Sequence, residues 1–195
     1  MSERTLDRRA VVARLLAGRR DLLVVSGLGS PTYDVAAAGD DAHNFYLWGA
    51  MGGAAMVGLG LALAQPRRPV LVVTGDGELL MGLGALATIA AANPGNLSIA
   101  VLDNGRYGET GGQRSHTAYR TDLAAAARGC GIADSRAVAE MSGADTFAER
   151  VHRIADRPAL AVFGVAAQES SRVLPSRDGA FLKSRFRKAL DLTET

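Results

Sequence analysis

The sequence contains one cysteine, Cys130, and only two lysines among its 22 basic residues. A single cysteine excludes an internal disulfide, which fits a reducing compartment such as the cytoplasm. Aromatic residues make up 5% of the chain, and the formal net charge is only +2, with acids and bases interspersed. This balance favours neither nucleic acid nor an anionic membrane as a partner.

Long hydrophobic runs are also missing. The apolar segment that begins at His43 ends at Gln65-Pro66-Arg67-Arg68, and it is shorter than the run of about 20 apolar residues that a membrane-spanning helix needs. The N-terminal sequence MSERTLDRRA is charged and lacks the apolar core of a signal peptide. We therefore expect a cytoplasmic protein without a membrane segment, folded as one domain over residues 1–195.

Short apolar runs alternate with stretches of helical length along the chain. This order is typical of a three-layer α/β/α fold with a mostly parallel central sheet. The turn that contains Gly27 and Gly29 lacks the third glycine of a dinucleotide fingerprint, so we expect it only to border a site. The predicted strands cover 21–25, 45–48, 70–73, 97–102, a short run ending near 138, and 158–165, and the predicted helices cover 5–18, 51–64, 78–92, 121–128, 142–155 and 179–192.

Two polar side chains follow neighbouring predicted strands. Asp76 lies in Gly75-Asp76-Gly77, and Asn104 lies in Asp103-Asn104-Gly105. A right-handed crossover makes the two strands parallel, so both side chains emerge at the same carboxyl edge of the sheet. Carboxylate and amide oxygens suit Mg²⁺, and the free N–H groups of a helix that opens at Glu78 favour a phosphate. Each turn alone is more typical of an ordinary loop, but together they predict a diphosphate held through Mg²⁺.

The spacing of these turns resembles the diphosphate-binding signature of thiamine-diphosphate enzymes. Asn104 follows Gly75-Asp76-Gly77 after 26 intervening residues, as in that family. The resemblance implies thiamine diphosphate and Mg²⁺ as cofactors, with Asp76, Asn104 and the main-chain carbonyl of Arg106 as metal ligands. It also places Glu78, where relatives commonly have a small residue, beside the diphosphate. The glycine-rich loop with Tyr107 and Gly108 would lie over the cofactor.

A second motif carries the same resemblance. The family has a turn of glycine, any residue, a large apolar residue and glycine before a helix of small residues, and Gly49, Ala50 and Met51 match it. The resemblance implies that Met51 wedges between the two cofactor rings. The Gly49 carbonyl and the Met51 N–H would bind the aminopyrimidine. Without the resemblance, the helix that follows is equally typical of a tightly packed core.

The resemblance covers only half of an active site. In these enzymes a second domain, which binds the pyrimidine, supplies a buried glutamate. We expect none of the seven glutamates here to occupy such an interior position, so the resemblance implies a separate pyrimidine-domain subunit and a hetero-oligomer. Segments such as NFYLWGAMG and LDNGRYGETGGQ most resemble the decarboxylases of sulfopyruvate and phosphonopyruvate.

The implied reaction is attack of the cofactor's C2 carbon on a small anionic 2-oxo acid, followed by loss of CO₂. Glu109 and His116 are this chain's candidates for proton transfer, and Arg114 suits an anionic substrate tail. Two other functions stay open. One is a carboligase of the acetolactate-synthase type on the same scaffold. The other is a non-catalytic binding or scaffold subunit, or a general Mg–nucleotide binder.

Overall fold

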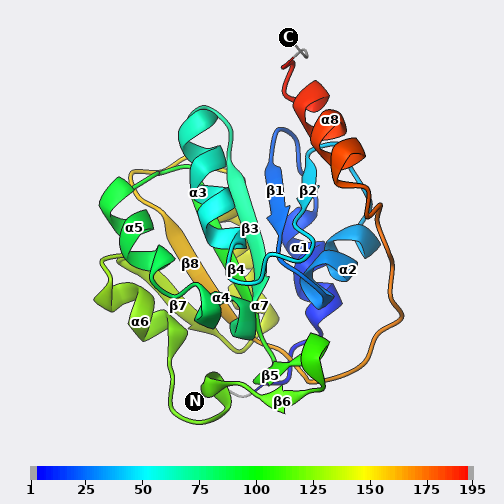
Figure 1. Cartoon of the computed structure of the whole chain (residues 1–195). Helices are drawn as coiled ribbons and strands as arrows, with labels where there is room; N and C mark the ends of the chain where they lie inside the picture. Colours follow the sequence, from blue (N-terminus) through cyan, green and yellow to red (C-terminus); the bar gives the residue numbers. More distant parts are fainter. Residues whose placement is uncertain (1–3, 193–195) are drawn as a thin grey trace.

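The protein is built around a six-stranded parallel sheet, and the computed structural model describes residues 4–192 (Figure 1). The strand order is β2-β1-β3-β4-β8-β7. All five strand pairings in this sheet are parallel, as the sequence predicted. The strands are β1 (Leu23–Ser26), β2 (Asn44–Tyr46), β3 (Val70–Gly75), β4 (Leu97–Asp103), β7 (Asp134–Val138) and β8 (Ala159–Gly164).

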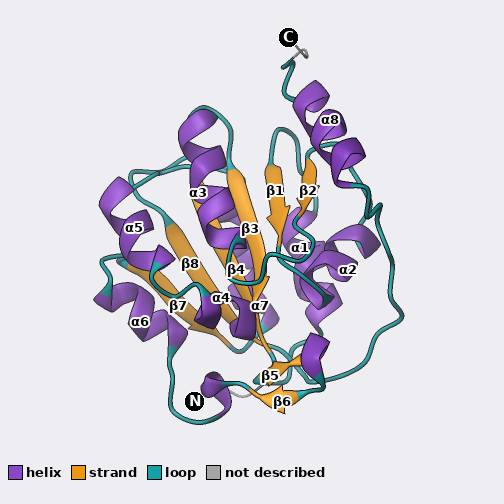
Figure 2. Cartoon of the chain, in the orientation of Figure 1, coloured by secondary structure: helices purple, strands orange, loops and turns teal. Residues whose placement is uncertain are grey.

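Helices cover both faces of the sheet and complete the predicted three-layer fold (Figure 2). One apolar cluster packs α1 (Arg8–Leu16), α2 (Ser30–Ala37) and α7 (Met141–Val151) on one face. A second cluster packs α3 (Ala54–Ala64), α5 (Ala85–Ala92) and α6 (Leu123–Gly129) on the other. The last helix, α8 (Gly179–Ala189), lies against β2 at the sheet edge. No helix within residues 4–192 is long and apolar enough to cross a bilayer.

The order of the strands fixes where a ligand can bind. β1 pairs with β2 on one side and with β3 on the other, so the chain changes direction across the sheet between β1 and β3. Ligands of open parallel sheets bind outside the carboxyl ends of the strands at such a point. Gly75 at the end of β3 is in register with Leu102 of β4. The turns that follow these two strands therefore meet at one edge, as the sequence predicted.

The predicted helix over 78–92 is divided in the structure. α4 (Asp76–Met81) continues directly from β3, and α5 begins at Ala85. A Cβ on Gly82 would lie 2.1 Å from the backbone oxygen of Gly52, so the chain passes here at a distance that only glycine allows. The residues on both sides of Gly82 favour a helix, and Gly52 lies 30 positions earlier in the sequence. The local sequence therefore could not predict this break.

Two other boundaries differ from the prediction. The residues after Gly29 form helix α2, where only a turn was predicted; Pro31 lies in its first turn, a position that proline favours. The predicted helix over 51–64 begins only at Ala54, which leaves Met51 in a turn. A small antiparallel pair, β5 (Arg106–Tyr107) and β6 (Gln113–Arg114), and two short 3₁₀ turns, η1 (Gly108–Thr110) and η2 (His116–Ala118), make up the glycine-rich region.

Candidate cofactor site

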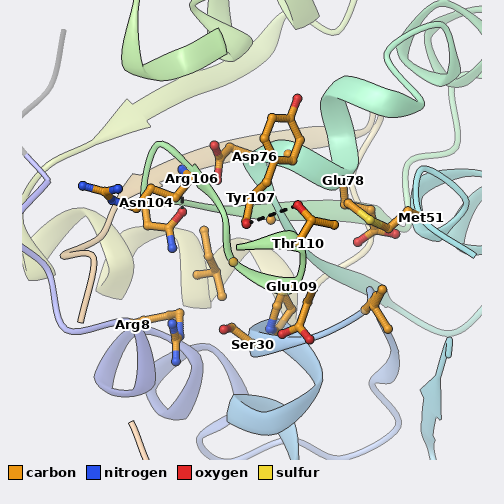
Figure 3. Close-up of a pocket in the computed structure, with 16 residues that line it drawn as sticks. Arg8, Ser30, Met51, Asp76, Glu78, Asn104, Arg106, Tyr107, Glu109 and Thr110 are labelled. Atoms are coloured by element: carbon orange, nitrogen blue, oxygen red, sulfur yellow. Dashed lines mark hydrogen bonds between the residues drawn. The ribbon is translucent and has the colours of Figure 1, made fainter. Parts of the chain in front are cut away.

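An open pocket of about 560 Å³ lies at the carboxyl edge of β3 and β4 (Figure 3). Five segments line it: the start of α1, the β1–α2 loop with the first turn of α2, the turn before α3, the end of β3 with the start of α4, and the end of β4 with the loop after it. Ten of the residues predicted from sequence are in this lining, namely Met51, Gly75, Asp76, Gly77, Glu78, Asn104, Arg106, Tyr107, Gly108 and Glu109. Of the remaining six, Leu28, Ser30 and Pro31 lie in and just after the turn that was expected to border a site, Thr110 lies in the glycine-rich loop, and Arg8 and Leu102 carried no sequence signal.

Asp76 is the most buried acid of the pocket, with 1% of its surface exposed. Its Oδ2 accepts hydrogen bonds from the hydroxyl groups of Ser115 and, at 3.1 Å, Thr117. Burial raises the pKa of the Asp76 carboxyl to about 6; the Ser115 hydroxyl opposes this rise, and the charge of nearby Asp103 adds to it. A cation bound beside this buried carboxylate would stabilise its charged form, because it neutralises the charge.

Behind Asp76 lies a polar network that the sequence analysis missed. The Thr117 hydroxyl also donates to Asp103 Oδ1 at 2.8 Å, and the Arg4 guanidinium forms a two-pronged ion pair with Asp103 at 3.1 Å for each contact. Arg4 also donates to the Thr117 carbonyl at 2.8 Å. This network holds the hydroxyl groups that orient Asp76. Its members are separated by up to 113 residues along the chain, so no local pattern reveals it.

Asn104 begins the loop after β4 and shapes it. Its Oδ1 accepts the N–H of Arg106 at 2.9 Å, and Gly105 has a φ of +70°, in the left-handed region. An amide oxygen has two lone pairs, so this bond leaves acceptor capacity for a cation. The Arg106 side chain donates to the Gly112 carbonyl at 3.0 Å, which closes the β5–β6 loop. Asn104 and Arg106 are thus brought to the same pocket as Asp76.

The turn before α3 forms the opposite end of the pocket (Figure 3). Gly49 and Gly52 have φ values of +78° and +88°, which set the chain direction on both sides of Met51. Met51 lines the pocket, whereas Gly49 and Ala50 lie outside its lining. We call residues 49–53 the Met51 turn. One pocket therefore joins an apolar side chain at one end to a buried carboxylate at the other.

Residues 28–169 match the family described as thiamine pyrophosphate enzyme, C-terminal TPP binding domain. The chain belongs to this family. The match spans both motifs on which the resemblance rested, the Met51 turn and the Asp76–Asn104 pair. Thiamine diphosphate is therefore the cofactor whose binding domain this fold represents.

Relatives in the family include decarboxylases. The chain is 51% identical to a phosphonopyruvate decarboxylase of Streptomyces viridochromogenes over 63% of this chain and 30% of that protein. It is 44% identical to a sulfopyruvate decarboxylase subunit beta of Methanocaldococcus jannaschii, over 56% of this chain and 58% of that one, and 44% identical to the same subunit of Methanothermobacter thermautotrophicus, over 65% and 68%. The chain thus spans about a third to two thirds of the length of these relatives.

Solved structures share the fold at low sequence identity. A putative thiamin diphosphate-dependent enzyme from Mycobacterium smegmatis superimposes with a TM-score of 0.72 at 23% identity, over 86% of this chain and 33% of that one. Benzoylformate decarboxylase from Polynucleobacter necessarius gives 0.69 at 16% identity, over 86% and 34%. These similarities establish the thiamine-diphosphate-binding fold of the chain.

The donors in the pocket fit this cofactor. Among the described residues, no group of three or more His, Cys, Asp or Glu side chains is arranged to hold a metal ion. Mg²⁺ uses few protein ligands and takes phosphate oxygens for the rest. A Cβ added to Gly75 or Gly108 would meet nothing within 4 Å, so both glycines leave open space on the lining where a diphosphate can approach the backbone.

Glu78 corrects one expectation from the sequence. We expected none of the glutamates in an interior position, but only 5% of the Glu78 surface is exposed. Its carboxylate accepts from the Thr74 hydroxyl at 2.6 Å and from the Ala54 N–H at 3.3 Å. Burial raises the pKa of the Glu78 carboxyl, and these hydrogen bonds oppose the rise. The carboxylate therefore contacts the elements around the pocket, and its charge is directed to the start of α3.

The two candidates for proton transfer lie in different places. Glu109 lines the pocket, and its carboxylate packs so closely on Gly29 that a Cβ there would lie 2.5 Å from Oε1. His116 is outside the lining, and its Nδ1 lies 3.3 Å from the Tyr107 hydroxyl. The Tyr107 ring packs on Gly77, where a Cβ would be 2.5 Å away. A role for Glu109 or His116 in catalysis stays a prediction.

Proposed function

We propose that the chain is the diphosphate-binding subunit of a thiamine-diphosphate-dependent 2-oxo acid decarboxylase of the sulfopyruvate or phosphonopyruvate type. The observation that carries this proposal is the single pocket that brings together Asp76, Asn104, Arg106 and Met51. Membership of the family and the names of the relatives support the reaction class.

The diphosphate end of the pocket would hold Mg²⁺. The Asp76 carboxylate, the Asn104 amide oxygen and the Arg106 carbonyl would be its protein ligands, an all-oxygen set of the kind that Mg²⁺ prefers. Gly75, Gly77 and Glu78 would offer backbone groups to the diphosphate, and Tyr107 and Gly108 would cover it. The Ser115 and Thr117 hydroxyls keep the Asp76 carboxylate oriented toward this role.

The ring end of the pocket would lie at the Met51 turn. The Met51 side chain would separate the two rings, and the Gly49 carbonyl and Met51 N–H would bind the aminopyrimidine, with Ala50 between them. When bound, the cofactor supplies a carbon nucleophile and an electron sink for decarboxylation. This chain's contribution is to bind and orient it, and Glu109 is the titratable side chain of the lining best placed to exchange a proton with substrate.

A separate subunit would complete the site. The two relatives named subunit beta are covered over 58% and 68% of their length, whereas the phosphonopyruvate decarboxylase of Streptomyces viridochromogenes is covered over only 30%. The name subunit beta implies a second subunit in those enzymes. We infer a partner that carries the pyrimidine-binding domain, so that the active enzyme is a hetero-oligomer.

The substrate would be a small anionic 2-oxo acid. The relatives are named for sulfopyruvate and phosphonopyruvate, both of which carry an acidic tail. The structure does not favour Arg114 as the group that binds this tail, because its guanidinium donates to the Ala118 carbonyl at 2.9 Å and stacks 4.5 Å from the Tyr119 ring centre. Arg106 lines the pocket, and its guanidinium is likewise bonded to a backbone carbonyl, that of Gly112 at 3.0 Å.

Calorimetric titration of thiamine diphosphate with Mg²⁺ tests the proposal. We expect weak binding to this chain alone and tight binding when a pyrimidine-domain protein encoded by a neighbouring gene is added. An Asp76→Ala variant should lose binding and still assemble with the partner, and an unrelated protein serves as the control partner. Equal binding to the Asp76→Ala variant would refute the assignment of the metal site.

Product analysis distinguishes the reaction from its alternatives. A decarboxylase would release CO₂ and an aldehyde from sulfopyruvate or phosphonopyruvate. A carboligase would instead convert pyruvate and an acceptor aldehyde to a longer product. A scaffold or a general Mg–nucleotide binder would show no dependence on thiamine diphosphate in either assay.

A further inference from the structure

Glu78 is a buried charged side chain whose hydrogen-bond partners lie in other elements. The Thr74 hydroxyl on β3 donates to Oε2 at 2.6 Å, the Ala54 N–H donates to Oε1 at 3.3 Å, and the Gly52 N–H lies close enough to stabilise the same carboxylate. With 5% of the residue exposed, these bonds replace water as the partners of the charge. The carboxylate therefore joins β3 and α4 to the Met51 turn.

The beginning of α3 depends on this contact. Its N-cap residue is Gly53, which provides no side-chain cap. The first N–H groups of a helix have no partner within the helix, and the positive end of the helix dipole favours a negative charge there. Glu78 supplies both the acceptor and the charge from a different element. It thus acts as the cap that the local sequence of α3 lacks.

Two glycines make room for this arrangement. A Cβ on Gly27 would lie 1.5 Å from Glu78 Oε2, so the β1–α2 loop can pass the carboxylate only without a side chain. Gly82, at the end of α4, packs against the Gly52 backbone in the same way. Three segments that surround the pocket therefore converge on one short helix, which starts at Asp76 and carries Glu78 two residues later.

We propose that Glu78 is a positioning residue that fixes the Met51 turn relative to Asp76, so that the ring end and the diphosphate end of the pocket are held at one separation. The effect on cofactor binding rests on the proposed function, whereas the mechanical link between Glu78 and the Met51 turn is a property of the chain itself. Loss of the link should weaken binding of a ligand that occupies both ends much more than binding of a ligand that occupies only the diphosphate end.

Two ligands separate these effects. Thiamine diphosphate and inorganic pyrophosphate, each with Mg²⁺, are titrated into the wild-type chain and into a Glu78→Ala variant, in the presence of the partner subunit. We expect the variant to lose about tenfold or more in affinity for thiamine diphosphate, since the hydrogen bond between the carboxylate and the start of α3 is removed, and to lose clearly less for pyrophosphate, because residue 78 keeps its backbone N–H. Equal losses for both ligands, or no loss for either, would overturn the proposal. Glu78→Gln, which keeps one acceptor oxygen, should recover part of the lost affinity.

Amide exchange tests the link without any cofactor. In the free chain, Glu78→Ala should speed hydrogen exchange at the Gly52 and Ala54 amides and leave exchange in α7 unchanged. Glu149→Ala, an exposed glutamate on α7 with 76% of its side chain accessible, is the matched control. If the wild type fails to bind thiamine diphosphate but the exchange result holds, the proposed function fails while the link stands. Unchanged exchange at Gly52 and Ala54 would refute the link.

A double-mutant cycle tests the packing of Gly27 on Glu78. Gly27→Ala should destabilise the wild-type chain, because the added methyl group meets the carboxylate. The same change should cost much less in the Glu78→Ala background, where that space is free. Gly60→Ala on α3 is the control, since a Cβ there meets nothing within 4 Å. An equal cost of Gly27→Ala in both backgrounds would show that the carboxylate is not what this glycine accommodates.

Discussion

At the scale of the residue, the buried charge of Asp76 destabilises the folded chain. A pKa raised from 3.8 to about 6 means that the folded state binds a proton more tightly than the unfolded state does. The stabilising contribution of the protonated group is therefore full below about pH 4 and is lost as the pH rises through 6. Each unit of this shift corresponds to about 1.4 kcal/mol, so charging Asp76 costs on the order of 3 kcal/mol in the absence of a cation.

We predict that Asp76→Asn stabilises the metal-free chain at pH 7.5 by about 1–3 kcal/mol, since it removes this buried charge but keeps the shape of the side chain. At pH 5 the gain should be smaller, because wild-type Asp76 is then largely protonated. Urea unfolding with a chelator at both pH values measures the difference. The variant should also lose binding of Mg²⁺ and thiamine diphosphate. A variant less stable than the wild type at pH 7.5 would contradict the account of Asp76.

The Ser115 hydroxyl stabilises the charged form of Asp76, and this gives a second prediction. Ser115→Ala should raise the pKa of Asp76 further, because a hydrogen bond to the carboxylate is lost. Mg²⁺ binds the carboxylate form only, so the pH at which Mg²⁺-dependent binding of thiamine diphosphate sets in should be higher in the variant than in the wild type. Titrations from about one unit below to about two units above the wild-type pKa of about 6 measure this. Thr146→Ala on α7 is a suitable control, since its hydroxyl bonds to the Ser142 carbonyl within the same helix.

The sequence could predict only those site residues that belong to a short motif. Asp76 and Asn104 each follow an apolar strand within a short glycine motif, so pattern and topology sufficed to bring them together. Ser115 and Thr117 carry no such pattern, and they reach Asp76 across 39 and 41 residues. Glu78 has a clear position in the motif, but its burial depends on Gly27 and Ala54, which the motif does not include.

At the scale of the element, α4 is the part of the chain that organises the site. It is six residues long, starts at Asp76, and ends where Gly82 meets Gly52. A single continuous helix over 78–92 would carry the end of this segment away from the Met51 turn. The break between α4 and α5 therefore matters for the site, because it allows Gly82 at the end of α4 to pack against Gly52 in the Met51 turn.

We predict that Gly82→Ala destabilises the chain by about 1–3 kcal/mol, the usual cost of forcing an added methyl group into a packed region. The atom that the methyl group would meet is the Gly52 backbone oxygen at 2.1 Å, which moves only if the Met51 turn moves. Thiamine diphosphate affinity should fall as well. Gly84→Ala is the matched control, since a Cβ there meets nothing within 4 Å. Chemical unfolding of both variants gives the comparison, and equal stability would refute the role of the contact.

The errors in the predicted elements have the same physical origin. Apolar periodicity located every strand of the large sheet, because buried parallel strands are short apolar runs. It joined α4 to α5, since helix-forming residues surround Gly82 and the reason for the break is a tertiary contact. It missed α2, which is short and follows the turn at Gly29 directly. The local pattern of apolar residues is thus enough to locate the strands. The breaks between helices depend on tertiary packing, which that pattern does not contain.

At the scale of the whole molecule, the three layers leave one sheet edge for α8 to cover. Beyond β2 the sheet has no further strand within residues 4–192, and α8 packs there with Leu182 and Phe186 buried. Phe186 meets Phe45 edge to face, with 5.5 Å between ring centres. An exposed strand edge invites pairing with another chain. α8 therefore covers the free edge of the sheet at β2.

We predict that Phe186→Ala costs about 3 kcal/mol of unfolding free energy, as expected for a buried aromatic side chain that loses its packing and a ring–ring contact. Phe181→Ala on the same helix is the matched control; Phe181 is 48% exposed, so its loss should cost less than about 1 kcal/mol. Urea unfolding measures both, and light scattering at increasing concentration should show association of the Phe186→Ala variant only. If α8 were merely appended to the domain, the two variants would unfold alike and neither would associate. A difference between them would show that this helix is part of the fold that supports the site.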